Sequence, residues 1–201
     1  MNEKLITQVK KYVNMLLWPL EWHYYHQYEH ALEVMDRVCD LWNKEWLSEN
    51  ELEILTLAAL FHDTWFAIQY DDNEYIWASI AKNYLKSVLY PEDKILIVQN
   101  LIISTIYSRN PENILENIMR DADTDNLWRD DFFDKWEKLK KEIETIKKIK
   151  ILDPDWLHYS LEFLKNHSFV TKTEIKERQP KKEENIKKLE EIVSKPHLTS
   201  L

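Results

Sequence analysis

Residues 48–63 have the sequence SENELEILTLAALFHD, and this stretch decides the fold class. Ser48 and Glu51 have the spacing of a capping box, which begins an α-helix. Apolar side chains then recur at helical spacing up to Phe61, and His62 and Asp63 follow directly. The apolar part, about 54–61, is far shorter than the roughly 20 residues that span a bilayer. The stretch therefore predicts a core helix with two polar residues at its end.

Helical spacing continues on both sides of this stretch. It predicts amphipathic helices over 31–42, 95–103, 115–122, 132–146 and 157–164. The expected start signals are Pro91, Asn110 with Pro111, and Asp153 with Pro154. Thr171–Asn185 is rich in Lys and Glu and contains Pro180, which indicates a surface connection to a final helix near 186–193. We expect an all-α, single-domain multi-helix bundle over residues 1–170, with 171–201 packed on it or trailing from it.

The chain of 201 residues contains no glycine, whereas an ordinary chain has about 7%. Glycine normally supplies the left-handed backbone of tight turns between strands, so its absence favours helices over sheets. Its absence also excludes a phosphate-binding P-loop, a G-x-G-x-x-G dinucleotide site and a G-x-S-x-G nucleophile elbow. Any phosphate chemistry must therefore depend on a metal ion or on basic side chains.

Charge and cysteine content restrict the partners and the compartment. The net charge of −9 argues against an extended nucleic-acid-binding surface, which needs clustered Lys and Arg. Cys39 is the only cysteine, so no intramolecular disulfide can form. With no apolar block in residues 1–10, we expect a cytoplasmic protein without a membrane partner. Nine tryptophans on amphipathic helices leave a homodimer open.

Four polar residues occupy positions where the helical pattern expects apolar ones. His30 lies one turn before Val34, His62 and Asp63 end the apolar run, and Asp123 lies one turn after Met119. Each alone has an ordinary explanation as a core residue or a helix cap. Burying a neutral polar group without a partner costs roughly 2–7 kcal/mol, and a charge costs more. One shared divalent cation would satisfy all four, and this nitrogen and oxygen set suits Mn, Fe, Co, Ni or Mg.

Three segments together resemble the HD superfamily of metal-dependent phosphohydrolases. They are YHQYEHA at 25–31, AALFHDT at 58–64 and RDAD at 120–123. Their order of His, His-Asp and Asp is the pattern of that family, and the resemblance covers about residues 20–135. The continuation WRDDFF at 128–133 is also similar to small bacterial members. The resemblance implies an HD-like helical bundle.

The resemblance also implies roles for individual residues. His30, His62, Asp63 and Asp123 would bind one divalent metal ion. His26 would donate a proton to the leaving oxygen, and Asp63 would help to take the proton of the attacking water. Asp121 competes with Asp123 as the fourth ligand, and we favour Asp123 because the family ligand follows a small residue. Arg120 and Arg129 are candidates for phosphate binding, the alternative being ordinary surface charges.

The implied activity is hydrolysis of a small phosphate ester, with a nucleotide as the leading candidate. Whether the enzyme would be a phosphomonoesterase or a phosphodiesterase stays open. Two departures from the family favour an alternative, a weakly active or non-catalytic regulatory module that binds metal and nucleotide. Trp65 replaces a common glycine, and Asn73 replaces a histidine, which argues against a second metal ion. A third reading is a helical scaffold with exposed Trp patches for a protein partner.

Overall fold

The computed structural model describes residues 1–17, 24–64 and 73–195, and all of its regular elements in these ranges are helices. The all-α prediction is therefore confirmed. The chain divides into two compact units, residues 1–123 and 124–201, which are described separately.

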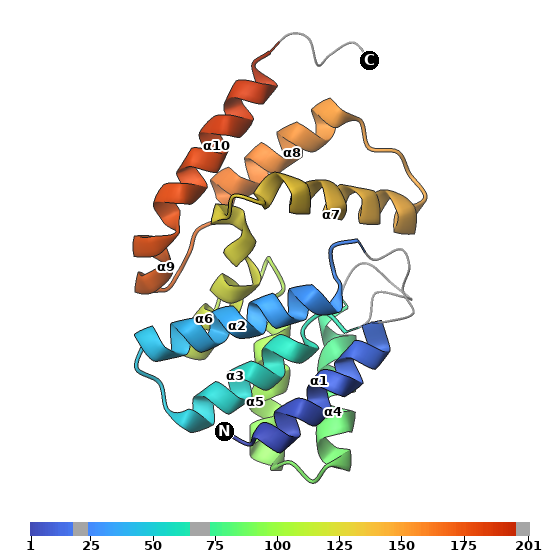
Figure 1. The fold of residues 1–201 in the computed structure, drawn as a ribbon, viewed down its shortest axis with the longest axis vertical. Coiled ribbons are helices and arrows are strands. Elements are labelled where there is room, and N and C mark those ends of the chain that lie inside the picture. The colour runs from blue at the N-terminus through green and yellow to red at the C-terminus, as the bar shows by residue number, and fades with distance from the viewer. Residues whose placement is uncertain (18–23, 65–72, 196–201) are drawn as a thin grey trace. The chain divides into compact units, whose positions relative to one another are not determined.

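The first unit is built around helix α3. Its helices are α1 (Glu3–Leu17), α2 (Tyr28–Lys44), α3 (Glu49–Phe61), α4 (Glu74–Ser87), α5 (Glu92–Ile103) and α6 (Ile114–Asp123). Helix α3 packs against each of the other five (Figure 1). Every residue from Leu52 to Phe61 is buried. A helix with apolar residues around most of its circumference belongs in a core, as the apolar run at 54–61 predicts.

The predicted capping box begins α3. The Ser48 hydroxyl accepts a hydrogen bond from the Glu51 backbone N–H, and the Glu51 carboxylate accepts one from the Ser48 N–H at 2.7 Å. Hydrogen bonds to Ser48 lower the pKa of the Glu51 carboxyl. Two N–H groups that the helix would leave unpaired are thus satisfied reciprocally.

Replacement of Ser48 by Ala is expected to lower the free energy of unfolding by about 1 kcal/mol, because it removes the hydroxyl that caps α3. Urea unfolding followed by circular dichroism measures the change. Ser194→Ala is the control, since Ser194 follows the last helix and its hydroxyl donates to a local carbonyl. Equal stability of wild type and Ser48→Ala would contradict the prediction.

The second unit has its own core. Its helices are the 3₁₀ turn η1 (Asp125–Trp128), α7 (Phe132–Lys147), α8 (Asp153–Asn166), α9 (Lys172–Glu177) and α10 (Gln179–Val193). Helix α10 packs against α8, α9 and η1, and its Leu189 joins the apolar cluster that includes Trp136 and Trp156. Residue 170, after which the sequence predicts a C-terminal segment packed on the main domain or trailing from it, lies inside this unit, between α8 and α9.

Three local predictions differ from the structure. The surface connection over Thr171–Asn185 is wrong, because α9 and the first half of α10 occupy it. Pro180 lies in the first turn of α10, where its missing N–H removes no helical hydrogen bond. Helix α6 is capped by Asn113, whose side chain accepts from the N–H groups of residues 115 and 116, and not by Asn110. Pro91 is the N-cap of α5 rather than its first residue.

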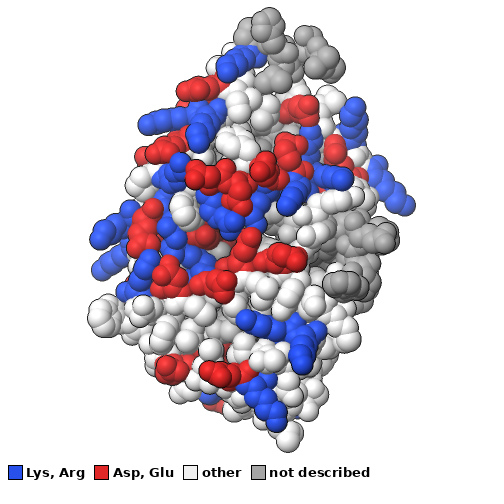
Figure 2. All heavy atoms as spheres, in the orientation of Figure 1, with Lys and Arg blue, Asp and Glu red and all other residues white. Residues whose placement is uncertain are grey.

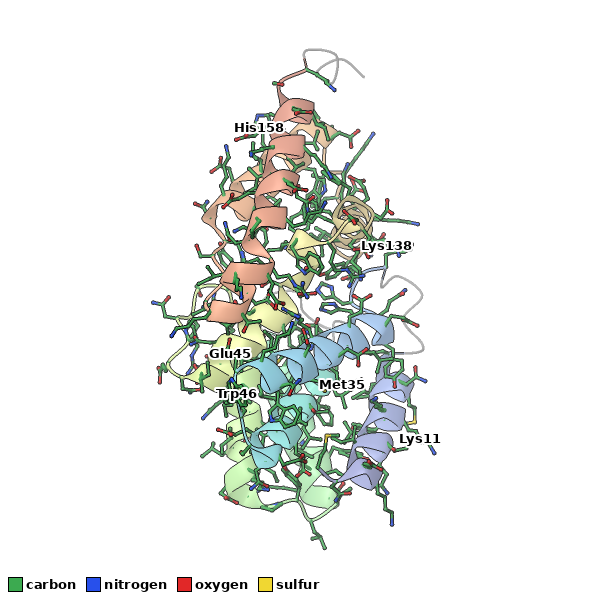
Figure 3. The ribbon with its side chains drawn as sticks, turned by 60° about the vertical axis from the view of Figure 1, so that its left-hand side comes forward. Lys11, Met35, Glu45, Trp46, Lys138 and His158 are labelled. Atoms are coloured by element: carbon green, nitrogen blue, oxygen red, sulfur yellow. The ribbon has the colours of Figure 1, made fainter. Side chains whose placement is uncertain are left out.

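Among the described residues of this glycine-free chain, three lie in the left-handed region of backbone conformation. Trp46, Leu89 and Lys148 have φ values of 59°, 57° and 52°. Trp46 lies in the turn between α2 and α3 and is 91% exposed (Figure 3). Lys148 is the C-cap of α7, a position that glycine occupies in many helices. Left-handed backbone costs a residue with a Cβ roughly 1–2 kcal/mol.

Replacement of Lys148 by Gly is expected to raise the free energy of unfolding by about 1 kcal/mol, because glycine relieves the left-handed strain at this exposed position. Lys147→Gly is the matched control. Lys147 is the last residue of α7, so glycine there should destabilise by about 0.5–1 kcal/mol. Chemical unfolding of both variants tests the prediction, which fails if the two substitutions change stability in the same direction.

Charged side chains are unevenly distributed over the visible surface. In Figure 2 the face formed by the helices of the second unit shows closely mixed Lys, Arg, Asp and Glu side chains, whereas the face of the first unit is mostly uncharged. Among the described residues, no helix combines the length and apolar character needed to cross a bilayer.

Candidate metal centre

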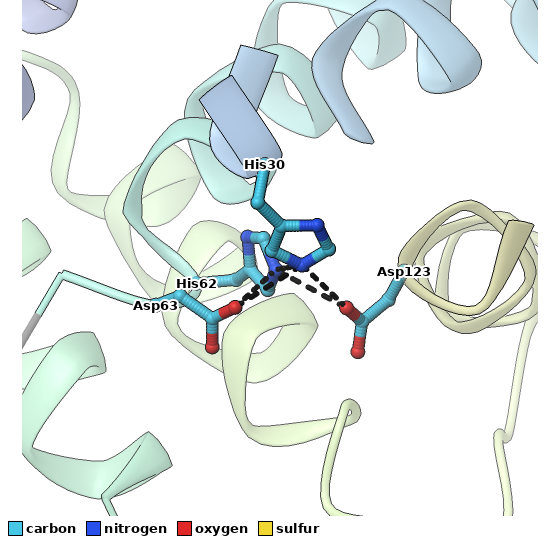
Figure 4. A group of neighbouring side chains, drawn as sticks. All are labelled: His30, His62, Asp63 and Asp123. Atoms are coloured by element: carbon cyan, nitrogen blue, oxygen red, sulfur yellow. Dashed lines mark hydrogen bonds and ion pairs between the residues drawn. The ribbon is translucent and has the colours of Figure 1, made fainter. Parts of the chain in front are cut away.

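Three helices of the first unit bring together the four predicted ligands. His30 lies in the first turn of α2, His62 is the C-cap of α3 with Asp63 directly after it, and Asp123 is the last residue of α6. Figure 4 shows the two imidazoles lying between the two carboxylates. One donor atom from each residue lies within 4.8 Å of the other three. Asp121, the competing candidate, is buried but is not part of this group.

The donor atoms have the spacing of ligands around one ion. Nε2 of His62 lies 3.3 Å from Nε2 of His30, 3.0 Å from Oδ2 of Asp63 and 3.2 Å from Oδ1 of Asp123. Nε2 of His30 lies 3.2 Å and 3.4 Å from the same two oxygens. Ligand bonds of about 2.0–2.2 Å place neighbouring donors about 2.8–3.6 Å apart in octahedral or tetrahedral geometry. All five distances fall in this range.

The orientation of His62 is fixed by the end of α3. Its Nδ1 is 2.7 Å from the carbonyl oxygen of Ala59, so a proton on Nδ1 is donated to that carbonyl. Nε2 is then the atom that faces His30 and the carboxylates. Thr64 is fully buried and its hydroxyl donates to the carbonyl of Phe61, which stabilises the turn after the helix. A carbonyl that orients a ligating histidine is typical of metal sites.

The electrostatics of the centre come from two carboxylates in a buried place. Burial alone would raise the pKa of Asp63, but the charges of His62 and His26 and hydrogen bonds from the histidines hold it well below its ordinary value. The same balance lowers the pKa of Asp123 to about 2. Burial opposes protonation of His62, yet the two carboxylates raise its pKa well above the ordinary value. Within the described ranges, histidines are the only ion-pair partners of either carboxylate.

This donor set fits a divalent cation. The side chains of His30, His62 and Asp63 are less than a tenth exposed, while that of Asp123 is 25% exposed. Two carboxylates would neutralise a divalent ion, and two imidazoles would complete a set of four donors. Six-coordinate ions would retain two positions for water or substrate oxygens.

His26 lies beside the centre but is not one of its four members. It precedes α2 and is half-buried, and its ring centroid is 6.0 Å from that of His30 in an edge-to-face arrangement. Its charge contributes to the lowered pKa of Asp63. Tyr25, to which the sequence assigned no role, lies 5.0 Å from the His30 ring and 4.7 Å from the His26 ring. Tyr25 directly precedes His26 in the sequence, and this adjacency is the one sequence signal that could have placed it near the centre.

The two arginines proposed to bind phosphate are engaged by protein groups. The guanidinium of Arg120 donates to the backbone carbonyls of Tyr107 and Arg109, which precede α6. Arg129 belongs to the second unit and forms two hydrogen bonds with the carboxylate of Asp131, at 2.8 Å and 2.6 Å. Either arginine would have to exchange these bonds to bind a phosphate.

Trp65 and Asn73 are the two residues at which the sequence departs from the HD pattern. Trp65 lies outside the described residues. Asn73 is the N-cap of α4 and only 2% exposed, and its side-chain oxygen and nitrogen make no hydrogen bond to the part of the chain that the structure describes. It is not a member of the four-residue group.

Comparison with known protein families, with characterised proteins and with solved structures finds no match for this chain. The case for a function therefore depends on the geometry of the four residues.

Proposed function

We propose that this chain is a metal-dependent phosphohydrolase that acts on a small phosphate ester, with a nucleotide as the leading candidate. The convergence of two imidazole nitrogens and two carboxylate oxygens within 4.8 Å supports the proposal. Mn²⁺, Fe²⁺, Co²⁺, Ni²⁺ and Mg²⁺ suit such donors. A bound ion of this kind lowers the pKa of a bound water and neutralises charge on phosphoryl oxygens.

The residues around the centre have distinct tasks in this proposal. His30 and His62 bind through Nε2, and the carbonyl of Ala59 keeps His62 in the required tautomer. Asp63 remains ionised because its pKa is held low, so it is able to bind the ion and orient the attacking water. His26, beside His30, is the candidate to protonate the leaving oxygen. Such a proton donor contributes typically 10²–10⁴-fold to a rate.

The test combines metal analysis with a substrate screen. The protein is purified without chelator and its metal content is measured by mass spectrometry. Turnover is then assayed with p-nitrophenyl phosphate, bis-p-nitrophenyl phosphate and a nucleotide panel, each with Mn²⁺, Co²⁺, Ni²⁺ or Mg²⁺. We expect near one equivalent of metal and turnover of at least one substrate. The mono- and diester probes separate the two classes of esterase.

The outcomes assign the function. Metal binding without turnover on any substrate would replace this proposal with a regulatory module that binds metal and nucleotide. Absence of metal together with absence of turnover would leave a helical scaffold for a protein partner. His26→Gln separates chemistry from binding, since it should retain the metal and lose turnover of esters with poor leaving groups most strongly.

A further inference from the structure

The first unit contains a cavity that shares no residue with the metal centre. It has a volume of about 570 Å³ and lies between the beginning of α1, helix α3 and the turn from α4 to α5. These elements meet near the N-terminus in Figure 1. The volume falls in the range of roughly 300–1,000 Å³ that is usual for small-ligand sites.

The buried carboxylate of Glu53 lines this cavity, and no side-chain cation of the described residues lies within ion-pair distance of it. Glu53 is 8% exposed, and its Oε1 accepts from the Tyr90 hydroxyl at 2.9 Å while its Oε2 accepts from the Asn2 N–H at 2.6 Å. An ionised carboxylate accepts about four hydrogen bonds, so acceptor capacity is left. The charge of Glu53 contributes to the raised pKa of the Met1 ammonium group, but that group forms its ion pair with Glu49, at 3.0 Å. Buried charges are normally paired, so a cation is the complement of this group.

Two lysines supply the opposite charge elsewhere in the cavity. Lys4 makes no hydrogen bond or ion pair within the described part of the chain. The Lys94 ammonium donates to the side-chain oxygen of Asn50 at 3.1 Å and lies 5.9 Å from the Tyr90 ring centre. Neither lysine pairs with Glu53, so positive and negative groups remain separate in one cavity.

Apolar side chains complete the lining. Leu5, Val88, Leu89 and Pro91 border the cavity, and Leu89 is 92% exposed although its backbone has a φ of 57°. Any ligand that covers this exposed apolar side chain removes apolar surface from water, which is favourable. The cavity thus presents an anionic group, cationic groups and an apolar wall.

From these groups we propose that the cavity binds a free α-amino acid with an apolar side chain. The ligand ammonium pairs with Glu53, its carboxylate pairs with Lys4 and Lys94, and its side chain covers Leu89. A simple amine would meet repulsion from the lysines, and a simple anion would meet repulsion from Glu53. The zwitterion is therefore the complementary class. This proposal does not depend on the proposed phosphohydrolase activity.

Isothermal titration calorimetry of the full chain with the twenty amino acids tests the proposal. Isobutylamine and isovalerate serve as probes that carry one charge each. We expect saturable binding of leucine, isoleucine or valine with a Kd in the millimolar range or lower. Both single-charge probes should bind at least about tenfold more weakly than these amino acids. Lys4→Ala/Lys94→Ala should weaken amino-acid binding about tenfold or more. Lys11→Ala, an exposed lysine of α1 outside the cavity, should bind as wild type (Figure 3).

Glu53→Gln should also lose the binding, provided that thermal unfolding shows it folded. If that variant does not fold, the lysine pair and the single-charge probes decide the result alone. The proposal is overturned if no amino acid binds in the millimolar range, if the lysine pair is dispensable, or if isobutylamine or isovalerate binds as tightly as the zwitterion.

Discussion

Replacement of Asp63 by Asn is expected to weaken Mn²⁺ binding by more than about 100-fold and to reduce phosphate-ester turnover to background. Removing even an outer partner of a metal ligand typically costs about 10–100-fold in affinity, and Asp63 is placed as a ligand itself. Asn has nearly the shape of Asp, but it lacks the charge that offsets a divalent ion among buried groups. Calorimetric titration with Mn²⁺ and a p-nitrophenyl phosphate assay measure the two effects.

Asp121→Asn is the comparison that tests which aspartate of the pair binds metal. Asp121 is buried on the same helix as Asp123 but does not join the four-residue group. We expect Asp121→Asn to retain the metal and Asp123→Asn to lose it. Circular dichroism and thermal unfolding show whether each variant is folded. Loss of metal in a folded Asp121→Asn, with retention in Asp123→Asn, would reverse the assignment.

The apparent affinity for Mn²⁺ is expected to rise about tenfold per pH unit from about pH 6.5 up to the raised pKa of His62. In the metal-free protein the carboxylates of Asp63 and Asp123 keep His62 protonated above its ordinary pKa. Binding through Nε2 requires that proton to leave. The carboxylates themselves are ionised throughout this range because their pKa values are lowered.

Stability should show the opposite pH dependence in the absence of metal. A histidine with a raised pKa in the folded state contributes stability that is complete below its unfolded pKa of about 6.5 and is lost as pH rises through the folded pKa. The metal-free protein should therefore become less stable toward alkaline pH. Saturating Mn²⁺ should abolish this trend above about pH 6.5, because the ion displaces the His62 proton in the folded state, and a ligand at 100 times its Kd adds about 2.7 kcal/mol of stability.

Urea unfolding with EDTA or with Mn²⁺, between about pH 6 and pH 8, measures both trends. His158→Gln is the control, because His158 is an exposed residue of α8 in the second unit and should leave the profiles unchanged. An Mn²⁺ affinity that does not vary with pH would show that His62 does not exchange a proton for the ion.

The sequence predicted helices best where apolar periodicity and a start signal coincide. The helix that begins with the capping box of Ser48 and Glu51 and the helix that begins at Asp153 have both signals and occur as predicted. The prediction of a surface connection after Val170 was wrong because a high Lys and Glu content and one proline do not by themselves break a helix. The first turn of a helix tolerates proline, so the effect of Pro180 depends on where the helix begins. Composition does not reveal that position.

The candidate site was predictable to a different degree. Inward positions of His30 and Asp123 followed from helical spacing, and their burial depends on the same spacing. The choice of Nε2 in His62 did not follow, because it depends on a carbonyl one turn earlier. The hydrogen bonds of Arg120 to the backbone carbonyls of Tyr107 and Arg109 could not be predicted from the sequence either, because they depend on the conformation of the loop before α6. The burial of Glu53 is another long-range feature, because α1 and the α4–α5 turn cover it.

The buried part of α3, from Leu52 to Phe61, has a kinetic consequence. Its amide protons have no local route to solvent, so they should exchange with deuterium only when the whole first unit opens. Two of the four donor residues follow directly on this helix, so an ion held there would be tied to the slowest-opening part of the unit. Loading the centre should then lengthen the lifetime of the native state, and deuterium uptake in α3 would report occupancy at a distance from the ion.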